Sequence, residues 1–402
     1  MSKPKIRFKG YEEDWEQRKF GNVTELKSAS RVHKEEWTTS GVPFYRSSDV
    51  MAAINGTENE KVYISEALYE KLSSISGKLE AGDVLVTGGG SVGKPYIVPN
   101  NEPLYTKDAD LLWIKNQGKF HPYFLYEFFF TPTFRSYLSS ISHVGTIAHY
   151  TITQLSETPI CLPSVGEQQK IGDYFYNIDH LITLHQRKCE ETKKLKKYML
   201  QKMFPQNGKR VPEIRFVGFT EDWEQRKVKE FAIESEVKGH SGKDAKKLTV
   251  KLHNKGVYVA DEKIQGSDNT QYYIRRAGQF IYGKQNFFNG AIGIVPKKLD
   301  KYESTKDVPA FDVSSDVNVD WLYYYIARPE IYKPQEALCT GTGSKRFHVN
   351  NFYNLSLAIP KMDEQIKIKE YFVHLDNLIT LHQRKYEELQ KIKKFMLQNM
   401  FI

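Results

Sequence analysis

Residues 88–95 read GGGSVGKP and form the clearest candidate in this chain for phosphate chemistry. They follow the apolar run GDVLV, and the spacing of Gly88, Gly93 and Lys94 resembles that of a nucleotide-binding P-loop. A working P-loop has Ser or Thr after the lysine to hold Mg²⁺, and a helix starts there. Here Pro95 follows the lysine, and PYIVP has the pattern of a strand. The sequence therefore predicts a glycine-rich hairpin loop rather than a site of nucleotide hydrolysis.

Other catalytic or metal-binding patterns are weaker still. The sequence contains no HExxH zinc motif, and DEK (261–263) is too short to predict a nuclease centre. His185 and His382 occupy equivalent positions in two similar segments, where a single histidine more often packs or hydrogen-bonds than binds a metal. The three cysteines form no CxxC pair, which argues against a disulfide framework or a structural zinc and favours a reducing, cytoplasmic setting. We therefore expect no catalytic residue and no metal site in this chain.

Length and charge leave several classes of partner open. A chain of 402 residues is long enough for two or three domains with cores of their own. No apolar run approaches the ~20 residues that span a bilayer, and the charged N-terminus is not a secretory signal. The net charge of +9 permits a polyanionic partner but does not by itself establish one.

An internal repeat is the most informative feature of the sequence. IRFKGYEEDWEQRK (6–19) recurs as IRFVGFTEDWEQRK (214–227) with only three differences. LITLHQRK (181–188) recurs unchanged at 378–385, and YMLQKMF near residue 200 is echoed by FMLQNMF near the C-terminus. The segments between these blocks, about 20–163 and 228–360, differ strongly from each other. The chain therefore has near-identical ends and divergent middles in each of two copies.

The repeated blocks at 167–204 and 363–401 predict two long amphipathic helices. Their apolar residues fall mostly at spacings of three and four, and a proline precedes each segment. Helices of this length, with Leu, Ile and Tyr on the apolar stripe, usually pair with each other, so we favour an antiparallel, coiled-coil-like pair. The alternative is that each helix only caps its own domain.

The divergent middles predict two versions of one mixed, mainly β domain. In the first, short strand patterns at 61–65, 82–87, 95–99 and 110–115 precede a helical stretch at 121–138. In the second, strand patterns at 256–260, 278–283 and 291–296 precede a helical stretch at 319–332. The predicted fold class is α+β, with two similar recognition domains joined by two long helices in a pseudo-twofold repeat. The boundaries that we expect are 1–163 and 207–360 for the two domains, and 164–206 and 361–402 for the two helices.

Loops rich in small, polar and basic residues recur at matching places in both copies and favour nucleic-acid binding. FYRSSD, GGGSVGK and SHVGTIAHY of the first copy correspond in order to KLTVKLHNKG, YGKQNFFNG and GTGSKRFHVNN of the second. Small residues let backbone N–H groups approach phosphates, while Lys, Arg, Asn and Gln can contact phosphates or base edges. The residues that we expect to contact DNA are Tyr45, Arg46, Ser47, Gly90, Ser91, Lys94, His143, Thr146, Lys251, His253, Lys284, Gln285, Asn286, Thr342, Ser344, Lys345 and Arg346.

Taken together, these features resemble the specificity subunit of a type I restriction–modification system. The resemblance is carried by the GYEEDWEQRK and GFTEDWEQRK segments, by PSVGEQ (163–168) and PKMDEQ (360–365) before the helices, by the two LITLHQRK helices, and by GDVLVTGGGSVGKPYIVP. It covers the whole chain. One departure is that SHVGTIAHYT (142–151) stands where the second copy has GTGSKRF (341–347), which argues against a one-to-one transfer of contacts from Lys345 and Arg346 to the first copy.

The resemblance implies a non-catalytic DNA-binding subunit with two target recognition domains. Each domain would read one half of a bipartite, asymmetric site in double-stranded DNA, and the helix pair would set the spacer between the halves. Two modification subunits, which methylate adenine, would bind this chain, and restriction subunits that move along DNA would join the complex. S-adenosylmethionine, ATP and Mg²⁺ would be used by the complex, and this chain would bind none of them.

Several predictions stay open at this stage. The helix residues that we expect to face the modification subunits are Leu181, His185, Arg187, Leu378, His382 and Arg384. The resemblance implies a bacterial, cytoplasmic protein without membrane contact. The alternatives are a nucleotide-dependent enzyme that uses the Gly88–Lys94 loop, or a non-catalytic adaptor whose two domains bind proteins.

Overall fold

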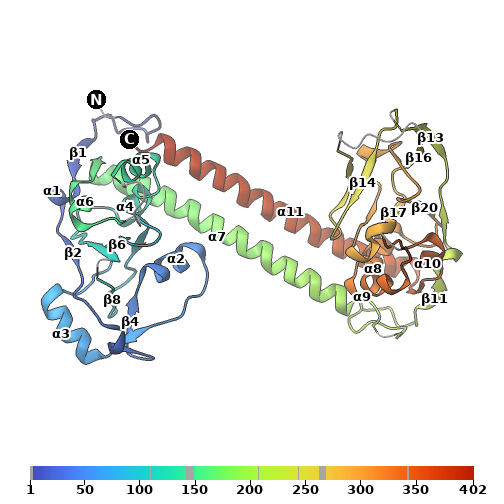
Figure 1. Ribbon diagram of the computed structural model, residues 1–402, viewed down its shortest axis with the longest axis horizontal. Helices are drawn as coiled ribbons and strands as arrows, with labels where there is room; N and C mark the ends of the chain where they lie inside the picture. Colours follow the sequence, from blue (N-terminus) through green and yellow to red (C-terminus); the bar gives the residue numbers. More distant parts are fainter. Residues whose placement is uncertain are drawn as a thin grey trace. The chain divides into compact units, whose positions relative to one another are not determined.

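A computed structural model describes residues 3–108, 110–141, 149–206, 208–242, 244–261, 269–341 and 344–402. The chain divides into two compact units (Figure 1). The first unit comprises Met1–Gln186 and Gln383–Ile402, and the second comprises Arg187–His382. Each unit therefore contains one divergent middle segment, one part of the helix α7 (Val165–Lys202) and one part of the helix α11 (Met362–Asn399).

The first unit combines short strands with short helices. Its strands are β1 (Glu16–Lys19), β2 (Leu26–Ser28), β3 (Trp37–Thr38), β4 (Val42–Tyr45), β5 (Tyr63–Ile64), β6 (Val84–Thr87), β7 (Pro95–Ile97), β8 (Tyr105–Thr106), β9 (Leu111–Ile114) and β10 (Pro159–Leu162). Its helices besides the long ones are α1 (Phe20–Val23), α2 (Ser47–Asn55), α3 (Glu66–Ser76), α4 (Pro122–Phe128), α5 (Pro132–Ile141) and α6 (Ile152–Glu157), with a 3₁₀ turn η1 (Lys34–Glu36).

The second unit has more strand and fewer helices. Its strands are β11 (Glu224–Lys227), β12 (Ala232–Glu234), β13 (Lys238–Ser241), β14 (Leu248–Lys251), β15 (Gly256–Val259), β16 (Gln271–Ile274), β17 (Phe280–Tyr282), β18 (Ile292–Ile294), β19 (Glu303–Ser304), β20 (Ala310–Val313) and β21 (Ser356–Ile359). Its short helices are α8 (Val319–Ile326), α9 (Pro329–Tyr332), α10 (Val349–Tyr353), and the 3₁₀ segments η2 (Val228–Glu230), η3 (Lys284–Asn289), η4 (Lys297–Leu299) and η5 (Lys333–Leu338).

Both units are built on the same four-stranded antiparallel sheet. Its strand order is β2-β9-β6-β7 in the first unit and β12-β20-β17-β18 in the second. A separate two-stranded sheet, β1-β10 or β11-β21, pairs the beginning and the end of each middle segment. The central strands β6 and β17 are buried along their whole length, as expected for apolar runs covered on both faces. The predicted α+β class and the predicted equivalence of the two copies are both confirmed.

The two units differ in what is added to this common sheet. The first unit carries a second sheet, β3-β5-β4-β8, together with α2 and α3. The second unit instead carries a three-stranded sheet, β13-β16-β19, and the hairpin β14-β15. The divergent middles therefore share a frame and differ in the elements attached to it.

A buried ion pair joins the repeated N-terminal block of each copy to the start of its long helix. In the first unit Arg7 Nε lies 2.6 Å from Glu167 Oε1 and Nη2 lies 2.8 Å from Oε2, a bidentate pair with a fully buried carboxylate. In the second unit Arg215 makes the same two contacts to Glu364, at 2.7 Å each. Trp15 Nε1 also donates to Glu167. This pair accounts for the repeat of the arginine in IRF and of the glutamate at the helix start.

The glutamine after each of these glutamates fixes a second segment. Gln168 accepts a hydrogen bond from His121 N at the start of α4 and donates one to Pro163 O. Gln365 likewise accepts from Asn318 N at the start of α8 and donates to Pro360 O. The EQ dipeptide therefore holds the proline, the long helix and the helix α4 or α8 together by paired side-chain bonds.

The end of each long helix completes the aromatic core of one unit. Phe401 stacks on Phe124 with ring centroids 5.2 Å apart, inside the core of the first unit. Phe204 occupies the same place in the second unit, 5.3 Å from Tyr325. Backbone bonds then link each helix end to its neighbouring N-terminal block, from Ile6 N to Asn399 O and from Ile214 N to Lys202 O. The repeated MF dipeptides are core residues.

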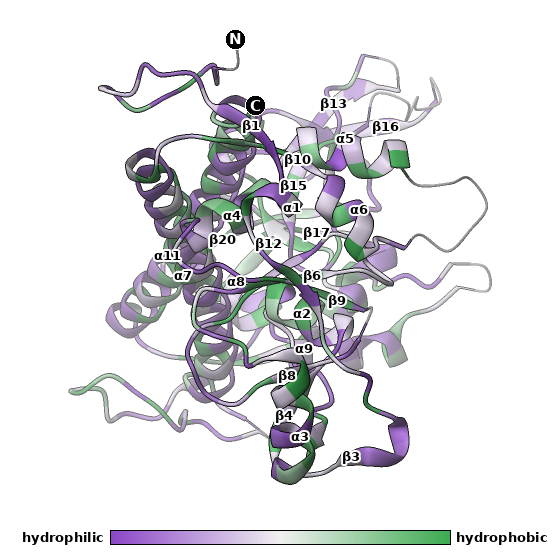
Figure 2. Cartoon of the chain, turned by 90° about the vertical axis from the view of Figure 1, so that its left-hand side faces the viewer, coloured by the Kyte–Doolittle hydropathy of each residue, from purple (hydrophilic) through white to green (hydrophobic). Residues whose placement is uncertain are grey.

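Within each unit the two long helices run antiparallel and are joined through a partly buried lysine. Lys393 Nζ lies 2.7 Å from Asp179 Oδ2 in the first unit, and Lys196 Nζ lies 2.6 Å from Asp376 Oδ1 in the second. Figure 2 shows purple and green alternating along α7 and α11, as expected for helices with one apolar face. The predicted pairing of the helices is confirmed within each unit.

Glu127 breaks the symmetry of this helix contact. The second unit has Tyr324 at the equivalent position, and its hydroxyl donates to Asp376 Oδ2 at 2.7 Å. In the first unit the fully buried Glu127 carboxylate lies 2.8 Å from Lys393 Nζ and beside Asp179. Burial raises the pKa of Glu127 to about 8, although Lys393 acts in the opposite direction.

Several elements differ from the predicted ones. The helical stretch 121–138 is two helices, α4 and α5, and 319–332 is likewise divided into α8 and α9, because Pro132 and Pro329 cannot continue the preceding helix. FYRSSD was expected to be a loop, but it is the end of β4 and the start of α2. KLTVKLHNKG was also expected to be a loop, but it is β14 and the turn into β15. Across the described ranges, no helix is long and apolar enough to cross a membrane.

Replacing Arg7 with Met should lower the free energy of unfolding of the first unit by about 3 kcal/mol, because Glu167 would stay buried without its cation. Denaturant unfolding followed by tryptophan fluorescence measures this. Arg18→Met, which removes an exposed arginine, is the control and should change stability by less than about 0.5 kcal/mol. Equal effects of the two substitutions would show that the buried pair is unimportant.

The raised pKa of Glu127 predicts a pH dependence of stability. Between about pH 4.5 and 8 the folded chain holds a proton that the unfolded chain releases, so stability should fall as the pH rises through this window. Glu127→Gln should flatten the dependence, while Glu12→Gln at an exposed position should not. Thermal melting at a series of pH values tests this, and an unchanged slope in Glu127→Gln would contradict the assignment.

Candidate nucleic-acid interface

The glycine-rich loop of the first unit is a tight hairpin between β6 and β7. Thr87 anchors it, since Thr87 N donates to Lys94 O, Gly93 N donates to Thr87 O, and Lys94 N donates to Thr87 Oγ1. Gly93 has φ +69°, and a Cβ there would lie 2.9 Å from Leu138 Cδ2, so the position requires glycine. The predicted hairpin loop is confirmed.

No helix follows this loop. Residues 88–93 also fit the letter patterns GxGxxG and GxSxG, but both of those motifs, like a P-loop, need a helix directly behind the loop. Here β7 begins at Pro95. The glycine pattern therefore lacks the structural context of a nucleotide site or a nucleophile.

Three of the predicted DNA-contacting segments meet at Asp110 in the first unit. Gly88 N donates to Asp110 O at 2.8 Å, and Tyr150 N donates to Gly88 O at 2.8 Å. Ser47 Oγ donates to the same Asp110 carbonyl at 3.0 Å. The Asp110 carboxylate lies 2.6 Å from Lys107 Nζ, and both side chains are partly exposed. The loop after β6, the start of α2 and the segment before α6 are thus held side by side by hydrogen bonds to Gly88 and Asp110.

The second unit repeats the same backbone pattern with different side chains. Lys284 N donates to Asp307 O at 2.8 Å, and Phe347 N donates to Lys284 O at 2.8 Å. Arg346 Nε lies 3.2 Å from Asp307 Oδ1. Asp307 is therefore the counterpart of Asp110, and the predicted pairing of GGGSVGK with YGKQNFFNG is confirmed by the backbone bonds.

Each cation of the second surface interacts with a carboxylate. Burial lowers the pKa of Lys284 and raises the pKa of Glu234, which interact with each other. Lys345 Nζ lies 2.8 Å from Glu336 Oε1, and both side chains are exposed. The three cations thus lie beside different carboxylates: Lys284 interacts with Glu234, Lys345 with Glu336 and Arg346 with Asp307.

The other predicted residues of the second unit lie on neighbouring segments. His253 N donates to Asn289 O, which places the β14-β15 turn against the loop 282–290 that contains Gln285 and Asn286. Lys251 Nζ lies 4.2 Å from the centre of the Tyr258 ring. Ser344 is partly buried. Thr342, like His143 and Thr146 of the first copy, lies outside the described residues.

The remaining predicted residues of the first unit fall into two groups. Gly90 and Ser91 are exposed at the tip of the β6-β7 loop. Arg46 contacts Asp49 Oδ2 at 3.0 Å and lies over the Trp37 ring, so its guanidinium helps to start α2. Tyr45 packs on Tyr96 with ring centroids 5.2 Å apart. The predicted match between FYRSSD and KLTVKLHNKG is wrong. FYRSSD includes the end of β4 in the sheet β3-β5-β4-β8, whereas KLTVKLHNKG includes β14 of the hairpin β14-β15, and these two sheets are not equivalent.

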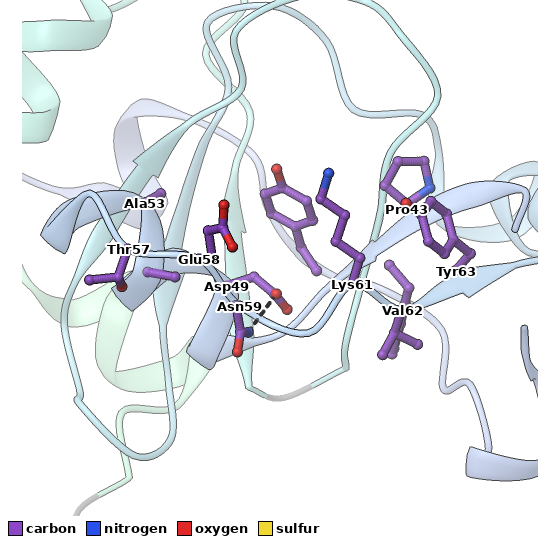
Figure 3. A pocket seen from close by; sticks show the side chains of 12 residues that line it. Pro43, Asp49, Ala53, Thr57, Glu58, Asn59, Lys61, Val62 and Tyr63 are labelled. Carbon is purple, nitrogen blue, oxygen red and sulfur yellow. Dashed lines mark hydrogen bonds between the residues drawn. The ribbon is translucent and has the colours of Figure 1, made fainter. Parts of the chain in front are cut away.

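A pocket of about 630 Å³ lies beside the first surface (Figure 3). It is lined by residues of β4, α2 and the segment before β5, including Tyr45. Asn59 Nδ2 donates to Asp49 Oδ1 at 2.7 Å at its floor, and Figure 3 shows Glu58 and Lys61 pointing toward the same open side. The pocket extends the surface around Ser47, since Ser47 and Asp49 begin the same helix.

Sequence reasoning missed the acidic residues at the centre of both surfaces. Asp110 and Asp307 each stand one to three residues before a buried strand, β9 or β20, which is a weak signal in a sequence alone. Lys107 was missed for the same reason. In the part of the chain that the structure describes, no group of three His, Cys, Asp or Glu residues could hold a metal.

The long helices expose pairs of apolar side chains at equivalent positions. Leu195 and Tyr198 of α7 are 45% and 49% exposed, and Ile392 and Phe395 of α11 are 45% and 54% exposed. Of the residues predicted to face partners, Leu181, Arg187 and Arg384 are exposed, whereas His185, Leu378 and His382 are partly buried. We call the pair in each unit, Leu195–Tyr198 or Ile392–Phe395, the helix patch.

Comparison with known proteins gives a consistent result. The chain matches the type I restriction modification DNA specificity domain family twice, over residues 12–194 and 220–391. A relative from Methanocaldococcus jannaschii, provisionally the specificity subunit of type I restriction enzyme MjaX, is 23% identical and covers 95% of this chain and 91% of its own. The type I restriction enzyme MjaVIII specificity subunit of that organism is 24% identical over 67% of each chain.

A solved structure has the same fold. The S subunit of a type I restriction–modification system from M. genitalium aligns with a TM-score of 0.60 at 13% identity, over 100% of this chain and 99% of that one. At this identity the likeness concerns the fold.

Proposed function

The chain belongs to the family of type I restriction–modification DNA specificity proteins, and on that premise we propose that its two units each read one half of a bipartite site in duplex DNA. The observation that carries this proposal is the repeated convergence at Asp110 and Asp307. One backbone pattern supports different side chains in the two units, namely Ser47 and Lys107 in one and Lys284 and Arg346 in the other. An identical frame with different polar groups suits two half-sites of different sequence.

The chemistry of these side chains suits the major groove of DNA. Arginine and lysine donate to guanine O6 and N7, and a carboxylate accepts from the amino group of cytosine. Arg346 with Asp307, and Lys107 with Asp110, offer both kinds of group at one point. Exposed Lys345 suits a phosphate, which positions the protein without reading sequence.

We further propose that the helix pair sets the spacer between the half-sites. Each long helix has 38 residues and so spans about 57 Å at 1.5 Å per residue. The lysine–aspartate contacts and the shared aromatic cores hold the helices side by side within each unit. Such helices resist bending, so their length is a natural measure of spacer length.

The expected partners are two copies of a modification subunit, and through them restriction subunits. The helix patches support this, because two equivalent apolar surfaces suit two identical partners. In this proposal S-adenosylmethionine, ATP and Mg²⁺ are bound by the partner subunits. The role of this chain in the chemistry is to place the partners on a chosen sequence.

Arg346→Ala should weaken duplex binding and relax discrimination at one half-site by about 1–3 kcal/mol, since it removes a base-reading cation. Lys345→Ala should instead weaken binding to all duplexes alike and lower the salt dependence by about one phosphate contact. Fluorescence anisotropy with target and unrelated duplexes, over a range of salt, separates the two effects. If Arg346→Ala alters neither affinity nor discrimination, this loop does not contact DNA. If the chain in that case still binds its protein partners with full affinity, the adaptor alternative is favoured.

Replacing Tyr198 and Phe395 together with Asp should abolish assembly with the modification subunits, because the charge would have to be buried in the interface. Size-exclusion chromatography of co-expressed subunits measures this. Each single variant should yield a complex with one modification subunit. Full assembly of the double variant would place the partner elsewhere, while loss of assembly in the Lys170→Asp control would show that any added charge suffices.

A further inference from the structure

Two cations of the first unit, Lys94 and Arg135, lie near the same aromatic ring and form no ion pair with any residue that the structure describes. Lys94 Nζ is 5.2 Å and Arg135 Cζ is 5.7 Å from the centre of the Phe130 ring. Both side chains are partly buried. Among the residues that the structure describes, no ion pair involves either of them, whereas Lys393, which also lies over Phe130, is paired with Glu127 and Asp179.

The surroundings leave hydrogen-bond donors of both cations unused. Arg135 Nη1 donates to Val92 O at 3.1 Å and Nη2 donates to Gly93 O at 2.7 Å, so its fork holds the glycine-rich loop. Its Nε, and the Lys94 ammonium, have no hydrogen bond within the described ranges. The neighbouring carbonyl oxygens carry only partial charge and cannot neutralise two partly desolvated cations.

The pKa values of both cations are lowered in this arrangement. Burial lowers the pKa of Lys94, and the nearby Arg135 lowers it further. Burial also lowers the pKa of Arg135. Two like charges held close together on a partly dry surface are unfavourable unless an anion joins them.

The feature is confined to one unit. The second unit has Ala291 where the first has Lys94, since Gly283 N donates to Ala291 O as Thr87 N does to Lys94 O. Counting from Pro329 as from Pro132, Tyr332 replaces Arg135 and Ala327 replaces Phe130. The cations are therefore not part of the common frame, which is what a contact specific to one half-site requires.

We propose that Lys94 and Arg135 form a phosphate-binding site for the DNA backbone at the half-site read by the first unit. This rests on the proposed function and deepens it by adding Arg135, which the sequence did not single out, and Phe130 as the aromatic ring that both cations lie near. Arg135 has two roles here: it positions the loop 88–94 through the two carbonyls, and it supplies charge. Guanidinium and ammonium groups are the usual partners of DNA phosphates.

The test compares the salt dependence of duplex binding by the full-length chain and its variants. Lys94→Gln and Arg135→Gln should each reduce the slope of log K against log salt by about 0.9, and the double variant by the sum of both. Lys119→Gln removes an exposed charge of the same unit and should leave the slope unchanged. Arg135→Lys keeps the positive charge but removes the two guanidinium hydrogen bonds to Val92 O and Gly93 O. It should therefore retain the slope even if the loop 88–94 becomes less well held.

The outcomes separate this inference from the proposed function. If the wild-type chain binds duplex DNA and the double variant has the same slope, the site is wrong while the proposed function stands. If the wild type binds no duplex, both fail. A second experiment titrates the wild type and the double variant with inorganic phosphate and with ATP. If the double variant no longer binds one of these anions but has the wild-type salt dependence of duplex binding, the two cations bind a free anion and not the DNA backbone. If Arg135→Gln fails to fold, Lys94→Gln decides alone, because the Lys94 side chain makes no hydrogen bond in the described structure.

Discussion

The buried contacts from Arg7 to Glu167 and from Arg215 to Glu364 are the constraint on which both units depend. A carboxylate that is taken out of water must be paired and hydrogen-bonded, and here a single arginine provides both donors. The arginine comes from the repeated N-terminal block and the glutamate from the first turn of a long helix. Each unit is thereby attached to the start of its long helix by the same contact, although the middle segments differ.

A fixed frame of this kind allows the attached elements to vary. The four-stranded sheet, the two-stranded closing sheet and the aromatic core around Phe204 or Phe401 are the same in both units. The first unit adds α2, α3 and a second sheet, while the second adds a three-stranded sheet and a hairpin. The segments that we propose face DNA are held at Asp110 and Asp307 by backbone bonds, so their side chains are free to differ. In the proposed function, the specificity of one unit could therefore change while the common frame stays the same.

The repeated parts were predictable because their letters recur. The spacing of apolar residues predicted both long helices. The glycines predicted the hairpin at 88–94, and the order of the strand patterns predicted its counterpart after β17. The added elements were not predictable in the same way. Helix α3 begins at a good N-cap, Ser65, but the described residues of the second unit contain no copy of it to reinforce the signal. Asp110 and Arg135 were missed because their roles come from contacts across the fold, to Gly88 and to Val92 and Gly93, which a local pattern does not contain.

The central claim is that two units of one chain read two different half-sites at a fixed separation. The most direct measurement is a genome-wide map of methylated adenines in cells that express this chain with its modification subunit. The account predicts one split motif with two unlike halves and a constant spacer, and a change in one half only when residues 20–163 are exchanged for those of a relative. A continuous motif, or a change in both halves after that exchange, would contradict it.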